Sequence, residues 1–539
     1  MDRPVSSEKR RLGRVVGGSL SQGLEVRLEP GVSVEDLAQG SYVVIAGQKE
    51  TKFFGMITDV QLGATSDQVK MTPPNVSDRF LADVISGTSI FGTLSVAPYV
   101  MWDEADPGVK PVKTIPAHFR EVFTASAEEV AQVFGADDDK HLFIGRPLDM
   151  EAKVCLDLTR VAERSTGVFG KSGTGKTYIT RWLLLGLAQK TNAVNLIFDM
   201  HNEYGWQGSD RVKGLQQLLS GRVAVFTLDE ASTRSRGGRP DFVVEIGYEH
   251  VLPEDMETLQ QEMDLSTAAL DCVHGLARRF GANNWLARFL EVEPGEDTDA
   301  LAAATNLHAG SLQALRRKLE RMMRDLDFLK PKVFDDSVAR ILEHLERGKH
   351  VILEFGSHGD RLHAYILVAN ILTRRIHEVY RERKEQSLGG KAPEPRPLVI
   401  TIEEAHKFLN PRVAEFTIFG TIAREMRKYN VTLLVVDQRP SGIYDDVMSQ
   451  IATRITCLLD DEKDVAAVLS GIHGSQQLRS VLSRLNTKQE ALILGHAVPM
   501  PVVVRTREYG TIESYREIQM SESRRSGNGD DDKLDKLLL

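Results

Sequence analysis

The run "GVFGKSGTGKT" at residues 167–177 constrains the fold of this chain more than any other stretch. Its letters from Gly170 to Thr177 match the phosphate-binding pattern G-x-x-x-x-G-K-[ST]. A short apolar run precedes the glycines, and Ile179 and Trp182 follow them at the spacing of one helix face. A strand, a glycine loop and a helix in this order predict an α/β protein with a P-loop at the edge of a parallel sheet.

The chemistry of this loop suits a nucleoside triphosphate and a divalent cation. Glycines let the backbone wrap closely around phosphate oxygens, and the helix N-terminus adds a positive field. We predict that Lys176 reaches the β and γ phosphates and that the Thr177 hydroxyl binds Mg²⁺, so the predicted cofactors are ATP and Mg²⁺. The alternative is a glycine-rich turn that binds no nucleotide. The predicted nucleotide-binding residues are Gly170, Lys171, Ser172, Gly173, Thr174, Gly175, Lys176, Thr177 and Tyr178.

From about residue 151 onward, apolar runs alternate with segments of helical periodicity. Continuous Val, Ile and Leu runs predict strands that are buried on both faces, as in a parallel sheet between helices. The predicted strands are residues 167–169, 194–199, 223–228, 350–355, 398–403, 432–437, 454–459 and 490–495.

The remaining segments differ in pattern from this α/β part. Four short apolar runs in the first hundred residues, separated by turns, predict a small β-barrel. The end of the chain, "KLDKLLL", is either a docking peptide or a frayed terminus. We divide the chain into a barrel (8–100), a connector with one helix near 125–134 (101–150), an ATPase core in two parts (151–249 and 346–510), an all-helical insertion (250–345) and a mobile tail (511–539).

Two adjacent carboxylates, Glu403 and Glu404, end the predicted strand "LVITIE". An acidic residue at the end of such a strand holds the Mg²⁺ beside a P-loop, and a following glutamate polarises the attacking water. We therefore assign Glu403 to the metal and Glu404 to the general base. Aspartate is the usual residue at the metal position, and the alternative is two glutamates that only face water.

Other strand ends also carry polar side chains. "TLLVVDQRPSG" ends in Asp437 and Gln438, and we expect Gln438 to sense the γ-phosphate or, alternatively, to cap a turn. In "IFDMHNEYG", His201 and Glu203 either help to place the nucleotide, signal to the next subunit or only pack the loop.

Hydrolysis also needs a positive charge on the developing γ-phosphoryl group. Arg424 and Arg427 lie three residues apart in "IAREMRKYN" and are candidates for arginine fingers that reach a neighbouring subunit. Arg164 is a further candidate. The alternative for each of the three is a solvated or structural arginine.

Composition excludes some classes of protein. The formal net charge of -9 argues against a protein that coats nucleic acid, although a local basic channel remains compatible with it. No apolar stretch approaches the roughly 20 residues of a membrane span, and no signal peptide is evident, so we expect a cytoplasmic location. Two basic clusters are either DNA contacts or solvated helix faces: Arg316, Arg317, Lys318 and Arg321, and Arg374, Arg375, Arg381, Arg383 and Lys384.

The motifs "GKSGTGKT", "DMHNEY", "IEEAH", "IAREMRKYN" and "DQRPSG" resemble, in order and spacing, those of the HerA branch of the FtsK–HerA ATPases. The resemblance covers residues 8–510, and the β part resembles the HAS barrel of that family. It implies a RecA-like core in a homohexameric ring that translocates double-stranded DNA through a central pore. It also implies roles for Lys176 and Thr177 at the phosphates, Glu404 as catalytic glutamate, Gln438 as sensor and Arg427 in trans.

The resemblance further implies a partner nuclease, either NurA-like in DNA end processing or an effector in antiphage defence. A second hypothesis is a scaffold that binds ATP and regulates a nuclease without extensive translocation. A third, a conjugative coupling ATPase of the TraG type, is weakened because the sequence contains no apparent membrane anchor.

Overall fold

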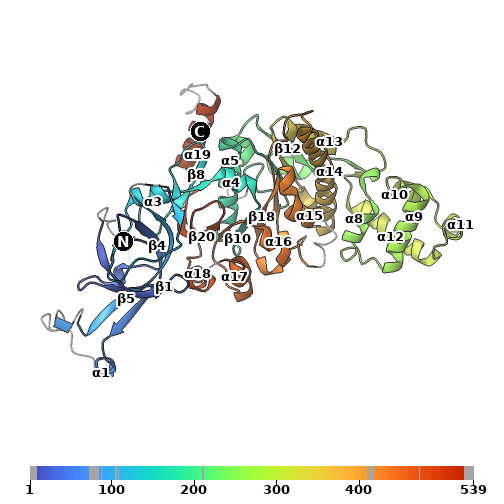
Figure 1. Cartoon of the computed structure of the whole chain (residues 1–539). Helices are drawn as coiled ribbons and strands as arrows, with labels where there is room; N and C mark the ends of the chain where they lie inside the picture. Colours follow the sequence, from blue (N-terminus) through green and yellow to red (C-terminus); the bar gives the residue numbers. More distant parts are fainter. Residues whose placement is uncertain are drawn as a thin grey trace.

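The computed structural model describes residues 9–71, 84–85, 88–103, 106, 108–208, 212–407, 409–411, 418–472 and 474–526. The molecule is elongated, with a β-barrel at one end, a large sheet covered by helices in the middle and a helical lobe at the other end (Figure 1). The proposed docking peptide at the C-terminus lies outside the described residues.

The barrel closes because β2 pairs with β1 on one side and with β5 on the other, in the order β2-β1-β7-β3-β4-β5. Its residues alternate between core and solvent: in β2, Leu24, Val26 and Leu28 are buried while Glu25 is exposed. Its strands are β1 (Arg11–Ser19), β2 (Gly23–Leu28), β3 (Tyr42–Ala46), β4 (Lys52–Ala64), β5 (Ile90–Trp102) and β7 (Glu121–Thr124), with β6 (Lys110–Pro111) added beside β5.

The barrel extends beyond residue 100, where the sequence placed its end. β7 lies between β1 and β3 and completes the closure. It has only 4 residues, which is too short to stand out as a strand in the sequence. The expected helix follows as α3 (Ala127–Phe134), where Ser126 and Glu129 form a reciprocal capping box.

The central sheet has 12 strands in the order β13-β12-β16-β11-β17-β18-β10-β19-β20-β21-β8-β9. All eight predicted strands are present, and three of them have the predicted bounds. The strands are β8 (His141–Arg146), β9 (Val154–Asp157), β10 (Thr166–Phe169), β11 (Val194–Asp199), β12 (Val223–Thr227), β13 (Phe242–Val243), β16 (His350–Glu354), β17 (Leu398–Glu403), β18 (Val431–Asp437), β19 (Thr453–Thr456), β20 (Glu490–Gly495) and β21 (Val502–Thr506).

The sheet is mixed rather than fully parallel. The strands from β13 to β19 are parallel, whereas β20, β21, β8 and β9 continue the sheet with antiparallel pairs. A short connection joins β20 to β21, and such a connection permits only an antiparallel pair. The apolar run at 490–495 indicated burial on both faces, which is correct, but burial does not encode strand direction.

Helices cover the sheet. In α5, which follows the P-loop, every residue from Ile179 to Ala188 is buried. In the described part of the chain, none of the helices is both long enough and apolar enough to cross a bilayer. The helices are α4 (Leu158–Glu163), α5 (Lys176–Lys190), α6 (Leu215–Leu218), α7 (Glu230–Ser235), α13 (Ser337–Glu346), α14 (Leu362–Leu388), α15 (Ile418–Glu425), α16 (Asp445–Gln450), α17 (Glu462–Leu469) and α18 (Ser475–Leu482).

The segment predicted as a mobile tail begins with a helix, α19 (Ile512–Ser526), that packs against α5 (Figure 1). Tyr515 and Ile518 are buried, and the side-chain amide of Gln189 donates to the carbonyl of Ile518 at 2.9 Å. The prediction was wrong for these residues because their apolar side chains are few and find their partners only in the folded core.

The described residues of the predicted insertion (250–345) form helices apart from β15 (Leu329–Lys330), which pairs with β14 (Ile246–Gly247) just before the insertion. It forms the lobe at the end of the molecule opposite the barrel (Figure 1). Its helices are α8 (Pro253–Thr258), α9 (Thr267–Phe280), α10 (Trp285–Glu291), α11 (Glu296–Thr305) and α12 (Ala309–Asp325).

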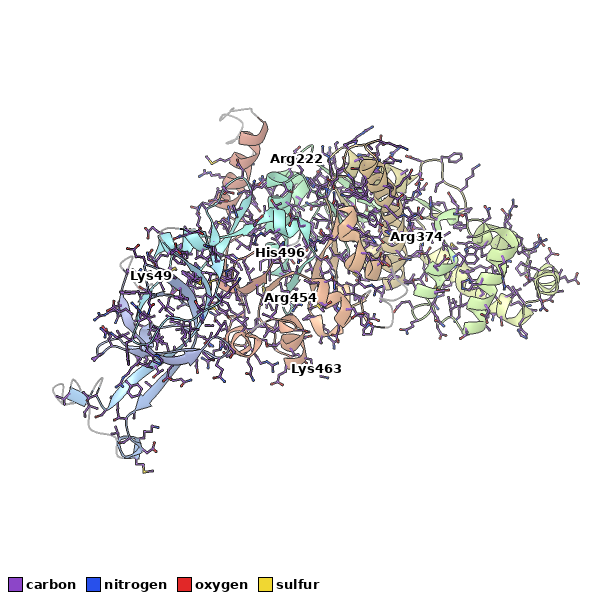
Figure 2. The ribbon with its side chains drawn as sticks, viewed as in Figure 1. Lys49, Arg222, Arg374, Arg454, Lys463 and His496 are labelled. Carbon is purple, nitrogen blue, oxygen red and sulfur yellow. The ribbon has the colours of Figure 1, made fainter. Side chains whose placement is uncertain are left out.

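The two basic clusters are largely neutralised inside the chain. Arg316 is buried, pairs with Glu320 at 2.8 Å and donates to the carbonyls that end α10, including Leu290 at 3.1 Å. Arg374 binds the buried Asp255 with two hydrogen bonds of 2.7 and 3.1 Å. These arginines are therefore structural, and so is Arg454, which donates to backbone carbonyls in the core. Figure 2 labels Arg374 and Arg454 among the side chains of the folded chain.

The Arg374–Asp255 pair joins α14 to the insertion, and its loss should destabilise the protein. We expect Arg374→Met to lower the free energy of unfolding by about 3 to 5 kcal/mol, because it leaves the buried Asp255 carboxylate without its cation. Thermal denaturation followed by circular dichroism measures the effect. Arg375→Met is the matched control, since Arg375 and Glu378 form an exposed pair worth about 0 to 1 kcal/mol. Equal losses in both variants would contradict this prediction.

Candidate active site

Four neighbouring strands of the central sheet each end in a carboxylate. In the order β16, β11, β17 and β18, these residues are Glu354, Asp199, Glu403 and Asp437. The strands are parallel and in register, so their carboxyl ends meet at one edge of the sheet. β10 pairs with β18 in the same direction, and the P-loop leaves its end at this edge. The fold therefore gathers the acidic residues beside the phosphate-binding loop.

The P-loop itself is closed by its own side chains. Lys176 Nζ donates to the carbonyl of Lys171 at 2.9 Å, and Thr174 Oγ1 donates to the same carbonyl at 2.8 Å. Burial lowers the pKa of Lys176, while the nearby carboxylates of Glu404 and Asp437 act in the opposite direction. The second lysine of the loop, Lys171, instead pairs with Asp460 at 2.7 Å.

Cys457, which the sequence analysis did not connect to the site, packs against Gly170 of the P-loop. A side-chain atom on Gly170 would lie 2.7 Å from the Cβ of Cys457 and 2.8 Å from the Oγ1 of Thr174, so only glycine fits there. Burial raises the pKa of the Cys457 thiol to about 11, which keeps it protonated at neutral pH. A single cysteine far along the chain carries no signal that could have revealed this contact.

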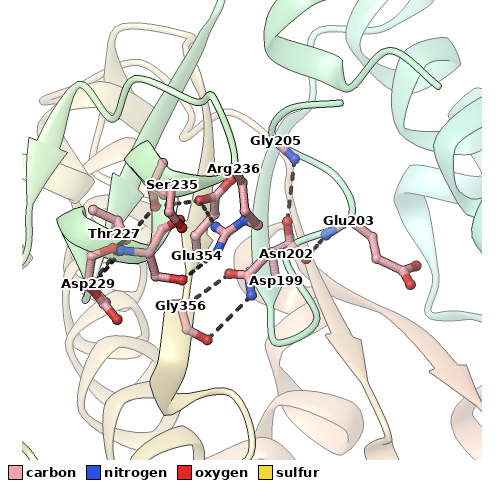
Figure 3. A network of polar contacts seen from close by, with 12 residues as sticks. Asp199, Asn202, Glu203, Gly205, Thr227, Asp229, Ser235, Arg236, Glu354 and Gly356 are labelled. Carbon is pink, nitrogen blue, oxygen red and sulfur yellow. Dashed lines mark hydrogen bonds and ion pairs between the residues drawn. The ribbon is translucent and has the colours of Figure 1, made fainter. Parts of the chain in front are cut away.

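Glu203 lies at the first turn of the P-loop helix. Its Oε2 accepts a hydrogen bond from the Thr177 hydroxyl at 3.0 Å. The backbone N–H groups of Glu203 and Tyr204 each donate to Asp199 at 2.8 Å, which fixes the loop after β11. Figure 3 shows the bonds of Glu203 and Gly205 to Asp199. Burial and the nearby Glu354 raise the pKa of Asp199 to about 7. Of the two polar residues weighed in this loop, Glu203 therefore reaches the site, whereas His201 is exposed.

Glu403 is buried and only half satisfied. The Tyr204 hydroxyl donates to its Oε1 at 2.9 Å, while its Oε2 is buried without a hydrogen-bond partner among the described residues. Burial, followed by the charges of Asp199 and Glu203, raises the pKa of Glu403 well above its usual value. Glu203, whose charge acts on Glu403, also accepts the Thr177 hydroxyl. A buried carboxylate oxygen without a donor suits a hard cation that takes oxygen ligands and keeps several waters, as Mg²⁺ does.

Glu404 points to a different partner. The amide Nε2 of Gln438 donates to its Oε1 at 2.8 Å. The backbone of Glu404 is left-handed, with φ of 50°, which is an uncommon conformation for glutamate. The structure thus brings together the two residues that the sequence proposed as general base and sensor.

His406 adds a link that the sequence analysis did not assign. Its Nδ1 lies 3.0 Å from Asp437 Oδ1, and its Nε2 lies 3.8 Å from Glu404 Oε2. The hydrogen bond with Asp437 raises the pKa of His406. His406 therefore connects the end of β18 to the candidate base and can hold a proton beside it.

The three candidate arginines are not at this edge in the same chain. Arg427 lines a cavity of about 1010 Å³ together with residues that precede β11, β17 and β18, so it lies at the amino ends of the strands. Arg164 lies two residues before β10, and its neighbour Glu163 lines the same cavity. Arg424, near the end of α15, is exposed. Strand β10 therefore separates Arg164 and Arg427 from the P-loop.

A phosphate-binding loop, a strand-end glutamate pair and a polar residue on the adjacent strand end define a P-loop ATPase. A family profile described as "Helicase HerA, central domain" matches residues 142–376, and one described as "HAS barrel domain" matches residues 12–114. The chain belongs to the HerA family.

Relatives and solved structures extend this comparison. The DNA double-strand break repair helicase HerA of Sulfurisphaera tokodaii is 23% identical over 509 residues, which cover 92% of this chain and 93% of the relative. The helicase of the same name from Pyrococcus furiosus is 23% identical over 417 residues, covering 71% and 72%. VirB4 of Thermoanaerobacter pseudethanolicus is 13% identical with a TM-score of 0.46, covering 69% of this chain and 98% of that one. The bacterial conjugative coupling protein TrwB, in an unbound form, is 10% identical with a TM-score of 0.47, covering 72% and 94%.

Proposed function

We propose that this protein is a cytoplasmic, ATP-driven translocase or helicase that acts on double-stranded DNA as a hexameric ring. One observation carries the proposal: Lys176, Thr177, Glu403, Glu404 and Gln438 gather at one sheet edge. They do so in a chain that aligns over 92% of its length with a relative named as a DNA double-strand break repair helicase.

The proposed chemistry assigns each side chain a task. Lys176 holds the β and γ phosphates, while Thr177 and Glu403 would hold Mg²⁺, which neutralises charge on the phosphate oxygens when bound. Glu404 orients the attacking water and accepts its proton. Gln438, hydrogen-bonded to Glu404 at 2.8 Å, couples the general base to the presence of the γ-phosphate. Because Thr177 would bind the metal through an oxygen lone pair, its hydroxyl proton can stay donated to Glu203.

The positions of the arginines support a ring. In one chain Arg427 lies at the edge opposite the P-loop, and Arg424 is exposed on the same segment. A neighbouring subunit could present either residue to the γ-phosphate, which would supply the positive charge that hydrolysis needs. Either arginine is then the finger in trans, with Arg164 as the third candidate.

A partner nuclease is part of the proposal. The long hairpin of β4 and β5 projects from the barrel, with α1 (Asp67–Met71) at its far end (Figure 1). Leu62 on β4 and Met71 on α1 are 81% and 82% exposed, so this projecting element offers apolar side chains to a partner. We propose this hairpin as the contact with a nuclease of DNA end processing or of antiphage defence.

The test is ATP hydrolysis by the purified protein with and without Mg²⁺ and duplex DNA. We expect hydrolysis that requires Mg²⁺ and rises when duplex DNA is added, together with displacement of a third strand from a triplex as a measure of translocation. Hydrolysis that does not respond to duplex DNA, combined with no strand displacement, would overturn the proposed function.

A second function, a ring scaffold that binds ATP and regulates a nuclease, is favoured by the neutralised basic clusters. Arg316 and Arg374 are held by Glu320 and Asp255, so they are not available to DNA phosphates. The scaffold predicts that the partner nuclease remains fully active with Glu404→Gln, whereas the translocase predicts that its processive activity is lost.

A further inference from the structure

An aromatic pair lies directly beside the P-loop. Tyr178 follows Thr177 in the sequence and is 37% exposed, although it lies in the first turn of a largely buried helix. Its ring stacks on that of Tyr509, with ring centroids 5.9 Å apart and planes inclined by 20°. Tyr509 comes from the segment between β21 and α19, so residues 331 positions apart meet here only in the folded chain.

The ring of Tyr509 is held in place by several contacts. Tyr509 is buried, meets Trp182 edge-on at 5.6 Å and Tyr515 edge-on at 6.2 Å. Its hydroxyl donates to the carbonyl of Lys213 at 2.8 Å. Because Tyr509 is already ordered, little side-chain entropy is lost when a ligand stacks on the Tyr178–Tyr509 pair.

A buried cation connects the pair to the nucleotide site. The guanidinium of Arg181 lies 5.8 Å from the ring centroid of Tyr178 and 5.3 Å from that of Tyr509. Arg181 also donates to the backbone carbonyl of Glu203, the residue whose carboxylate accepts the Thr177 hydroxyl at 3.0 Å. The aromatic pair and the proposed metal site thus share one rigid framework.

A triphosphate gripped by Lys176 and Thr177 leaves its nucleoside outside the glycine loop, where it needs a surface of its own. Stacking on aromatic rings is the interaction that any base can make, because every base has a π-face. We propose that Tyr178, supported by Tyr509, is the platform on which the purine base of the bound nucleotide stacks. This inference rests on the proposed binding of ATP and adds a base-binding subsite to it.

The test compares two ligands that share the phosphates but not the base. The dissociation constants of β,γ-imido-ATP and of inorganic tripolyphosphate, each with Mg²⁺, are measured by isothermal titration calorimetry for wild type, Tyr178→Ala and Tyr178→Phe. For Tyr178→Ala we expect about 5- to 100-fold weaker binding of the ATP analogue and unchanged binding of tripolyphosphate. Tyr178→Phe, which keeps the ring, should bind both ligands as wild type does.

Each other outcome is also decisive. Unchanged affinity of Tyr178→Ala for the ATP analogue, or an equal loss for both ligands, would overturn the base platform, the second result meaning that Tyr178 only shapes the loop. If wild type binds neither ligand, the proposed nucleotide site fails and the platform fails with it. The fluorescence of 2-aminopurine riboside triphosphate is an independent readout, because stacking should quench it in wild type and Tyr178→Phe but not in Tyr178→Ala.

Discussion

Replacing Glu404 with glutamine is expected to lower the rate of ATP hydrolysis by about 10²- to 10⁴-fold while ATP still binds. Glutamine preserves the shape of the side chain and can still pair with Gln438, but it cannot accept the proton of the attacking water. The neighbouring Glu403 is a poor substitute for this base, because it is buried and accepts a hydrogen bond from the Tyr204 hydroxyl. Steady-state phosphate release and equilibrium binding of ATP, measured on the same preparation, check both parts of this prediction.

Glu291→Gln is a suitable control for this substitution. Glu291 lies on α10 in the helical lobe, in an exposed pair with Arg288 and away from the candidate site, so the same chemical change should leave the rate unchanged. If Glu404→Gln hydrolysed ATP at the rate of the control, Glu404 would not be the general base. A loss of ATP binding in Glu404→Gln would instead indicate that the residue shapes the site.

Lys176→Ala should weaken ATP binding by about 30- to several-thousand-fold, because truncation of one partner of a buried charge pair costs about 2 to 5 kcal/mol. Lys176 is the P-loop lysine whose amine lies near the carboxylates of Glu404 and Asp437. Without the ammonium group, the phosphates would face this acidic edge with less compensating charge. Titration with a fluorescent ATP analogue measures the loss.

The same loop supplies the matched control for the lysine. Lys171→Ala also removes an ammonium group from the P-loop, but the Lys171 amine pairs with Asp460 and is 39% exposed. We expect Lys171→Ala to bind ATP within a few-fold of wild type, because such partly exposed pairs contribute only about 0 to 1 kcal/mol. Comparable losses in both variants would mean that the overall charge of the loop, rather than the position of Lys176, governs binding.

The sequence alone was sufficient for the features that depend on local pattern. The P-loop needs glycines at fixed positions, so its sequence motif predicts its backbone conformation. The strands β11, β17 and β20 begin and end at the residues where the apolar runs begin and end. The class of fold, the ATPase activity and the membership of the HerA family follow from these local motifs and their order. The roles of the individual site residues stay predictions, although the structure brings Glu404 and Gln438 within hydrogen-bond distance.

Only the tertiary structure decided the features that join distant parts of the chain. These features are the hydrogen bond between Thr177 and Glu203, the packing of Gly170 against Cys457 and the stacking of Tyr178 on Tyr509. The tertiary structure also turned the basic residues Arg316 and Arg374 into internal pairs. Strand direction, burial and ion pairing depend on which elements become neighbours when the chain closes its core, and that information is spread over the whole sequence rather than held in any one segment.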